Sequence, residues 1–375
     1  MKPVIYASTS PAISERETKH CELARKICAE GIVLLENKGI LPLKTKKVAL
    51  YGAGARHTSF GGTGSGENNP RYCVTVEEGL QSAGIEIVSN KWLNDYDALF
   101  ESESDKYHKK LSKALKKVPL AKRMDYAADN PFYLPAGRTL DSSDTICDTA
   151  VYVLTRQAGE GADRKDIPGD YYITDEEKKL MISVTEHHLD TILVLNTGSV
   201  IDLKFLDSIK FSAVILLLQG GMESGNALAD IITGKVNPSG RLADTWADAY
   251  EDYPSSETFS ERNPEKYQED YREGIFVGYR WFDKRHIKPR YPFGYGLSYT
   301  EFKVSFESLS NEGSNIIVTA SVTNTGKAAG REVVTLFMSY PDSNHVREVR
   351  SLTAFAKTLL LEPGDSELEI GRAHV

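Results

Sequence analysis

Short apolar runs alternate with helix-like segments along the first two thirds of the chain. Each run is only four to seven residues long, which is the length of a buried strand rather than of a helix. The runs lie at Val48–Gly52, Ile85–Val88, Ala150–Leu154, Thr191–Asn196 and Ala213–Gln219. Strands that alternate with helices in this way favour a mainly parallel sheet covered on both faces, so the sequence predicts an α/β fold.

The segments between these runs carry helix signals. Thr174-Asp-Glu-Glu177 is a capping box, which marks the start of a helix. The spacing of apolar residues predicts further helices over Ile13–Glu36, Val76–Ala83, Trp92–Arg123 and Glu223–Thr233, the third of them exposed. Ligands of such sheets bind beyond the carboxyl ends of the strands, so the loops after Gly52, Thr155 and Gln219 are the candidate sites.

The pattern changes near Tyr299. From Phe302 onward apolar residues alternate with polar ones, and turn signals such as Asn324-Thr-Gly326 and Pro363-Gly364 separate the runs. This is typical of an antiparallel β-sandwich. We therefore expect an αβα domain over residues 1–300, including an aromatic-rich linker at 252–298, and an incomplete sandwich over 301–369.

Composition narrows the function classes. The net charge is −8, which argues against a nucleic-acid partner. The four cysteines are scattered without a CxxC pair, so neither a metal site nor a redox motif is indicated. No apolar leader is visible, and the longest apolar run, at 213–218, is too short to cross a bilayer. We expect a cytoplasmic protein with no membrane partner and no cofactor.

A glycine-rich stretch, Gly61–Gly66, follows the first strand. Its spacing does not fit GxGxxG, and Glu67 stands where a P-loop needs lysine, so nucleotide binding is disfavoured. Two interpretations remain open. The stretch is a tight turn, or it lines a pocket in which Thr63 and Ser65 present hydroxyl groups to a polar ligand.

Glu160 lies between two glycines in the loop after the third strand, Gly159-Glu-Gly161. A sterically open carboxylate at this edge of a sheet suits a general acid that must reach a leaving group. Asp163 and Arg164 stand close enough in sequence to tune its charge. On loop position alone, a solvated turn is the favoured interpretation. Other polar residues weigh less as catalysts; these are His187, His188, Asp202, Asp207 and Glu223.

Several stretches together resemble glycoside hydrolase family 3 β-glucosidases. They are Leu23–Gly31 with Leu34–Asn37 and Leu41–Leu43, the loop Gly61–Gly66, Gly159–Arg164 with Pro168–Asp170, Gly225–Asp230, Asn237–Leu242 and Tyr291–Thr300. Gly330–Val334 and Leu352–Gly364 resemble the fibronectin type III-like domain of that family. The resemblance covers nearly the whole chain in the expected order.

The resemblance implies double displacement at terminal non-reducing β-D-glycosides, with Glu160 as the general acid/base. It places Ser65, and with it Thr63, near the sugar. The family's nucleophile is an aspartate in a (β/α)8 barrel, and no eightfold pattern occurs here. The expected partners are therefore a β-linked oligosaccharide or aryl/alkyl glycoside and a barrel that follows in an inverted domain order. The alternative is a non-catalytic module that binds carbohydrate or a partner protein.

The last six residues, Ile370–Val375, do not continue the alternating pattern. They also match the translation of a common sequencing-adapter segment. We therefore expect a non-native tail at 370–375, with the strand pattern ending at Glu369.

Overall fold

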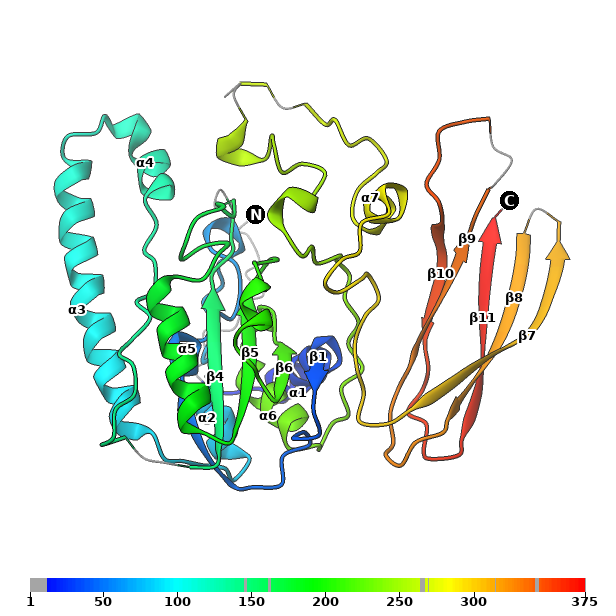
Figure 1. The fold of residues 1–375 in the computed structure, drawn as a ribbon, viewed down its shortest axis with the longest axis horizontal. Coiled ribbons are helices and arrows are strands. Elements are labelled where there is room, and N and C mark those ends of the chain that lie inside the picture. The colour runs from blue at the N-terminus through cyan, green and yellow to red at the C-terminus, as the bar shows by residue number, and fades with distance from the viewer. Residues whose placement is uncertain are drawn as a thin grey trace, which may run out of the picture.

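The protein consists of a six-stranded sheet between helices and a smaller β-sandwich beside it (Figure 1). This computed structural model describes residues 12–144, 147–160, 163–263, 267–268, 270–313, 315–340 and 344–374, although the side chains of Ser65, Glu261 and 372–374 are outside that description.

The large sheet has the order β1-β6-β5-β4-β2-β3. Its strands are β1 (Val33–Asn37), β2 (Lys47–Tyr51), β3 (Glu86–Ile87), β4 (Thr149–Arg156), β5 (Asp190–Thr197) and β6 (Ala213–Leu216). All neighbours are parallel except β1 and β6, which pair antiparallel. The predicted mainly parallel α/β sheet is thereby confirmed.

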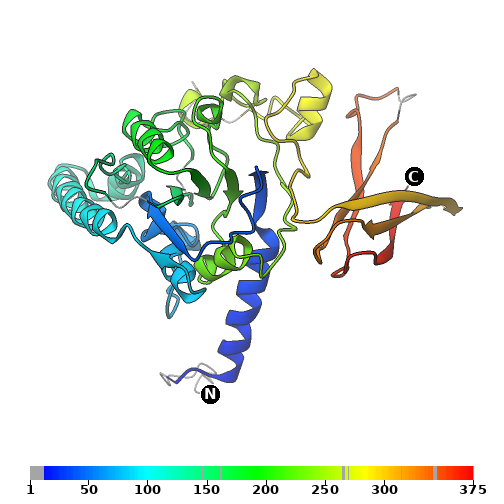
Figure 2. The ribbon, with the colours of Figure 1, turned by 60° about the horizontal axis from the view of Figure 1, so that its bottom comes forward.

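Helices cover both faces of this sheet, as Figure 2 shows. The α-helices of the described residues are α1 (Glu15–Gly31), α2 (Val76–Ser82), α3 (Asn90–Leu115), α4 (Arg123–Asp129), α5 (Asp175–His187), α6 (Ser224–Ile232) and α7 (Tyr279–Arg285), the last of which contacts the β-sandwich. Because both faces are covered, all eight residues of β4 are buried, which explains why its sequence is a nearly continuous apolar run.

The helix predicted over Ile13–Glu36 is wrong at its C-terminal end. The helix stops at Gly31, and Val33–Asn37 forms β1. Ile32, Leu34 and Leu35 are each 0% exposed, so burial on both faces of an edge strand, rather than one helical stripe, accounts for the apolar run.

The predicted exposed helix over Trp92–Arg123 also differs. It divides into α3, which ends at Leu115, and the short α4. The first turns of α3 bury Trp92, Leu93 and Tyr96 against the core, and the Trp92 ring meets the Tyr51 ring of β2 edge-on at 5.4 Å. Large aromatic residues at the start of α3 therefore fasten it to the sheet, while its later turns are exposed.

The β-sandwich contains a three-stranded sheet, β11-β8-β7, and a two-stranded sheet, β10-β9. The strands are β7 (Phe302–Glu312), β8 (Asn315–Asn324), β9 (Val333–Met338), β10 (Ser351–Lys357) and β11 (Ser366–His374). An apolar cavity of about 200 Å³ lies between the two sheets. The expected strand end at Glu369 is corrected, because β11 stays paired with β8 as far as His374. That the last six residues are non-native stays a prediction.

The linker before the sandwich contacts the edge strand β1. Leu297 donates its amide to the Leu34 carbonyl at 2.8 Å and forms an isolated bridge with it. The hydroxyls of Tyr295 and Tyr291 add bonds to the Leu35 carbonyl at 3.0 Å and to the Glu36 carboxylate at 2.7 Å. The free side of β1 is thereby covered by the linker. Within the described ranges, no helix has the length and apolar character that a bilayer crossing requires.

Candidate active site

The loops after β2, β4, β5 and β6 meet at the carboxyl edge of the large sheet. Three of them were candidate sites from the sequence, since parallel strands direct their carboxyl ends to one edge. The loop after β2 is the glycine-rich stretch, Gly61–Gly66, and the loop after β4 carries Glu160. The structure therefore brings the two predicted stretches together.

Glu160 and Thr63 are direct neighbours. The Glu160 amide donates to the Thr63 carbonyl at 3.2 Å. The Glu160 side chain is exposed and lies against Gly64, where a Cβ would come within 3.1 Å of Glu160 Cβ and 3.3 Å of its Oε2. Gly64 also has a φ of +74°, so both its conformation and its neighbour favour glycine at this position.

The third predicted residue of this group, Ser65, has its backbone in a short 3-10 turn, Gly64–Gly66. Its side chain lies outside the described residues, so its role toward a sugar stays a prediction. Gly159 approaches the same loop so closely that a Cβ there would overlap the Thr63 hydroxyl. The glycines on both loops thus permit the close approach of two backbones.

A buried ion pair fixes the start of the loop that carries Glu160. Arg156, the last residue of β4, forms two bonds to the Glu177 carboxylate at 2.7 and 2.6 Å, and both side chains are 7% exposed. Glu177 also accepts the Thr174 amide at 2.8 Å, which confirms the predicted capping box. The helix cap and the loop therefore share one carboxylate.

A second buried pair holds the far end of this loop. Arg164 bonds the Asp170 carboxylate at 2.5 Å and the Ser199 hydroxyl at 3.0 and 2.9 Å. Asp170 also accepts the Lys165 amide at 3.0 Å. Arg164 is thus engaged in anchoring the loop, while Asp163 lines a cavity beside it.

Two hollows flank the joined loops. One has a volume of about 390 Å³ and lies between Gly159 and Asp163–Lys165 on one side and Pro131–Leu134 on the other. The second, of about 460 Å³, is lined by the glycine loop and by Gln157 and Met222. Aromatic and aliphatic walls with a few polar groups are the usual lining of sites for small polar ligands.

Polar residues at the ends of the strands connect the loops, and the search for candidate residues in the sequence missed them. Asn196 is 0% exposed and accepts the Ser59 amide and the Thr155 hydroxyl, each at 2.6 Å. Gln157 accepts the Ser59 hydroxyl at 2.7 Å and donates to the Gly61 carbonyl at 2.6 Å. The available signal was an amide side chain that ends an apolar run.

The side-chain hydrogen bonds of the other polar candidates go to residues outside the glycine-rich stretch and the Glu160 loop. Buried His188 lies near the start of β4, where its Nδ1 is 2.5 Å from the Cys147 carbonyl oxygen. Asp207 pairs with Arg290 at 2.8 Å, and Glu223 accepts the Tyr72 hydroxyl at 2.6 Å. Burial raises the pKa of Asp202. His187 contacts the Ser183 carbonyl at 2.9 Å within its own helix.

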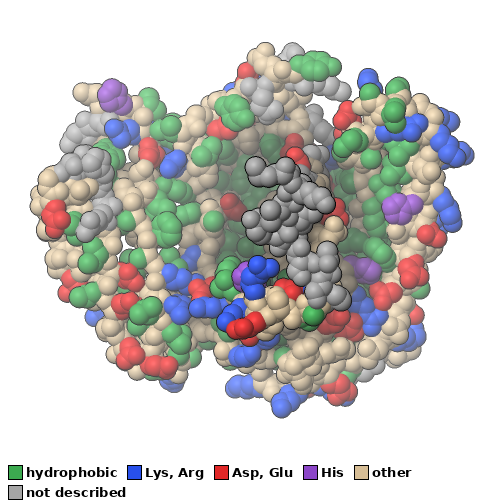
Figure 3. All heavy atoms as spheres, turned by 180° about the vertical axis from the view of Figure 1, so that it is seen from behind, with side chains coloured by type: hydrophobic (Ala, Val, Ile, Leu, Met, Phe, Trp, Pro, Cys, Tyr) green, Lys and Arg blue, Asp and Glu red, His purple; other side chains and the backbone are tan. Residues whose placement is uncertain are grey.

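No metal centre is evident in the part of the chain that the structure describes, which contains no cluster of three or more suitable ligands. Acidic and basic side chains are interspersed over the face shown in Figure 3. At the joined loops an exposed carboxylate, that of Glu160, lies beside the hydroxyl-bearing Thr63.

Known proteins match most of this chain in sequence and in fold. The model of the glycosyl hydrolase family 3 C-terminal domain matches residues 32–299. β-Glucosidase A of Butyrivibrio fibrisolvens is 36% identical over 93% of this chain and 45% of its own length. A β-glucosidase of Ruminococcus albus is 34% identical over 93% of this chain and 35% of its own. The chain thus spans less than half the length of these relatives.

Among solved structures, β-glucosidase 3B of Thermotoga neapolitana in complex with glycerol superimposes with a TM-score of 0.80 at 32% identity, over 98% of this chain and 50% of that one. The same enzyme in complex with α-D-glucose gives 0.80 over 96% of this chain. Since the family model covers most of the chain, the chain belongs to glycosyl hydrolase family 3 and carries its C-terminal domain.

Proposed function

We propose that this chain supplies the general acid/base of a retaining β-glycosidase, and that Glu160 is that residue. In such a reaction one carboxylic acid protonates the departing oxygen and then activates water, while a second carboxylate attacks the anomeric carbon. The placement of Glu160 supports this role, because it is exposed at the carboxyl edge of the sheet and its chain neighbour Gly159 lines an open hollow.

One observation carries this proposal. The Glu160 amide is bonded to the Thr63 carbonyl, and the Glu160 side chain rests on Gly64. The other interpretation of this stretch is a solvated turn. Such a turn does not require a hydrogen bond from its backbone to a second loop. An acid that must meet a leaving-group oxygen does need such placement, because general acid catalysis depends on reach as well as on pKa.

The expected substrate is a β-linked oligosaccharide or an aryl or alkyl β-glycoside. The relatives named above are β-glucosidases, and one solved relative holds α-D-glucose. The hydroxyls of Thr63 and Ser65 belong to the loop that faces Glu160 and are the proposed contacts to the sugar. The hollow beside Gly159 adds the apolar wall Pro131–Leu134 for the group that departs.

The nucleophile in this proposal comes from a (β/α)8 barrel outside the present chain. Retaining enzymes hold their two carboxyl groups about 5–5.5 Å apart. The barrel must therefore approach the carboxyl edge of the sheet, where Glu160 is exposed. By itself the chain is expected to hydrolyse glycosides poorly, since it carries one half of the pair.

The test replaces Glu160 by Gln in a protein that joins this chain to a (β/α)8 barrel. General acid catalysis contributes about 10²–10⁴-fold. Turnover of an alkyl or oligosaccharide substrate should fall by about that factor, whereas a 2,4-dinitrophenyl glycoside, whose leaving group needs no proton, should lose little in its glycosylation step. Glu176→Gln, an exposed residue of α5, is the matched control and should leave both rates unchanged.

Equal rates for the Glu160→Gln variant and its parent would contradict the proposal. That outcome favours the second candidate, a module that binds carbohydrate without acting on it, for which the hollow of about 390 Å³ with its aromatic wall is the supporting observation. Isothermal titration calorimetry of the chain with cellobiose then measures the binding directly.

A further inference from the structure

Gln219 contacts the glycine loop and the Glu160 loop at the same time. Its side-chain amide lies 2.9 Å from the Ser59 hydroxyl, 3.0 Å from the Gly61 carbonyl and 3.2 Å from the Ala158 carbonyl. Ser59 and Gly61 belong to the loop after β2, and Ala158 belongs to the loop after β4. One NH₂ group thus joins two loops that approach it from different strands.

The fourth loop closes around the same side chain. A Cβ built on Gly198, in the loop after β5, would overlap Gln219 Oε1 and would lie 2.6 Å from Ala158 Cβ. Glycine at this position therefore leaves the space that the Gln219 amide occupies. Each of the four loops after β2, β4, β5 and β6 thus touches Gln219 or carries it.

The backbone before Gln219 is strained. Leu218 has a φ of +60°, in the left-handed region that side chains other than glycine avoid. Buried Asn196 donates from Nδ2 to the Leu218 carbonyl at 2.6 Å and to the Ser59 carbonyl at 2.9 Å. Such conformations persist only where the surroundings fix them. Here the bond from Asn196 fixes Leu218, and the turn at Leu218 directs Gln219 toward the loops.

We propose that Gln219 is a positioning residue that sets the placement of Glu160 relative to the glycine loop. It does so through Gly61 and Ala158, which lie two residues before Thr63 and Glu160 respectively. Those two residues are joined by the hydrogen bond from the Glu160 amide to the Thr63 carbonyl. This inference rests on the proposed role of Glu160 and extends it to the group that holds the acid in place. Asn196 acts in support by holding the backbone from which Gln219 projects.

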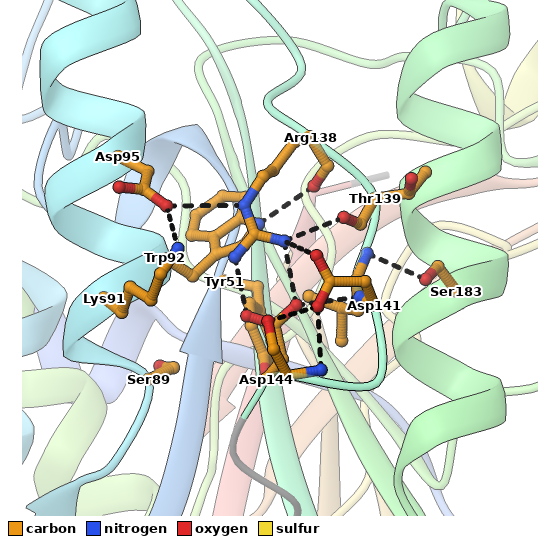
Figure 4. A network of polar contacts seen from close by, with 12 residues as sticks. Tyr51, Ser89, Lys91, Trp92, Asp95, Arg138, Thr139, Asp141, Asp144 and Ser183 are labelled. Carbon is orange, nitrogen blue, oxygen red and sulfur yellow. Dashed lines mark hydrogen bonds and ion pairs between the residues drawn. The ribbon is translucent and has the colours of Figure 1, made fainter.

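The first test uses this chain as it is and does not depend on catalysis. Gln219→Leu keeps much of the side-chain volume and removes the donors. Amide hydrogen exchange, read by NMR or mass spectrometry, should become several-fold faster at Glu160 and across 61–64, because the bond between the loops then opens more often. Arg138→Gln is the control, since it disrupts a polar network between α3 and α5 at a different place in the domain (Figure 4).

A second variant guards against a Gln219→Leu protein that fails to fold. Gly198→Ala retains the Gln219 amide but intrudes on its space, and it should accelerate exchange at the same amides. Exchange at Glu160 that stays at the parent rate in both variants, or that rises only as much as in Arg138→Gln, would overturn the inference.

The second test measures how leaving groups respond in a protein that joins the chain to a (β/α)8 barrel. In the Gln219→Leu variant the general acid is misplaced, so hydrolysis of an alkyl glycoside should slow by about 10–100-fold, which is part of the full contribution of such an acid. Hydrolysis of a 2,4-dinitrophenyl glycoside should slow far less. A role in folding alone would lower both rates together, as expected for Arg138→Gln.

The two proposals fail differently. If Glu160→Gln shows no dependence on the leaving group, the acid/base assignment is wrong, while the exchange experiment still reports whether Gln219 joins the loops. If Glu160→Gln shows the dependence and Gln219→Leu does not, only the positioning role is wrong.

Discussion

The large sheet and the β-sandwich bury their side chains to very different degrees. Every residue of β4 is buried, whereas most residues of β7 are exposed. Large apolar side chains of the sandwich stand in solvent, with Phe306 68% and Phe355 73% exposed. A sheet covered by helices on both faces completes its own core, but two sheets of three and two strands cover each other only in part.

Burial of apolar area supplies most of the stabilising free energy of a fold. The difference in burial therefore implies that the stability of the chain resides in the αβα domain. It also implies that exposed apolar surface on the sandwich favours self-association. Three pairs of variants compare the two regions.

The largest difference is expected for the truncation of a leucine. Leu193→Ala in β5 removes a side chain that is 0% exposed and should lower the free energy of unfolding by about 2–5 kcal/mol. Leu309→Ala in β7 removes one that is 57% exposed and should change it by about 0.5 kcal/mol or less. Urea unfolding of both variants measures the pair. Equal losses of unfolding free energy in the two variants would contradict the expected difference between the large sheet and the sandwich.

A smaller difference is expected for the loss of an arginine. In the network of Figure 4, Arg138 bonds the Asp144 carboxylate at 2.8 and 2.6 Å, and the Asp144 side chain is 5% exposed. This hydrogen bonding holds the pKa of Asp144 below its ordinary value. Arg138→Met leaves that buried carboxylate without its cation and should cost about 1–3 kcal/mol.

The matched change in the other region is Arg350→Met. Arg350, just before β10, pairs with Asp283 at 2.7 Å, but its side chain is 44% exposed. An exposed pair of this kind contributes about 0–1 kcal/mol. Thermal unfolding of both variants should therefore show the larger shift for Arg138→Met, and the reverse order would place the stronger pairing at the sandwich.

The smallest difference concerns pH. Burial lowers the pKa of His188 below its ordinary value of 6.5. Below pH 6.5 the unfolded chain therefore binds a proton that the folded chain does not, so the free energy of unfolding falls as the pH falls, by at most about 1.4 kcal/mol per pH unit. His188→Phe should reduce this slope in equilibrium unfolding measured between pH 7 and pH 5.

Glu369 in β11 should respond in the opposite direction. Burial raises its pKa above the ordinary value of 4.5. The folded chain then retains a proton that the unfolded chain has lost, so the contribution of this group is present below pH 4.5 and is lost as the pH rises through the folded pKa. Glu369→Gln should remove that dependence, and a slope of the same sign as that of His188 would contradict the assignment.

Much of the large sheet could be predicted because its strands are buried on both faces. The runs at Val48–Gly52 and Ala150–Leu154 are apolar throughout, and such runs between helices leave few alternatives. Leu34 and Leu35 were assigned to the wrong element, since a short apolar run after a helix continues its spacing. Only the antiparallel pairing with β6 distinguishes a strand from a continued helix here.

The site was predictable to a similar extent. Glu160 could be located because it follows a strand and lies between glycines, and the family motif then favoured a catalytic role over a turn. Asn196 and Gln219 could not be located from the sequence, because an uncharged amide side chain does not stand out there. Their roles depend on which loops come together in space. The strain at Leu218 is likewise a property of the backbone and not of the residue type.

The contact between the linker and the free edge of β1 affects whether two copies of the chain can associate. An uncovered edge strand offers its backbone to any other strand, including that of a second copy. Here the bridge from Leu297 occupies that edge only five residues before β7 begins at Phe302. The segment that protects the sheet from joining a neighbour is therefore also the tether that restricts how far the sandwich can swing.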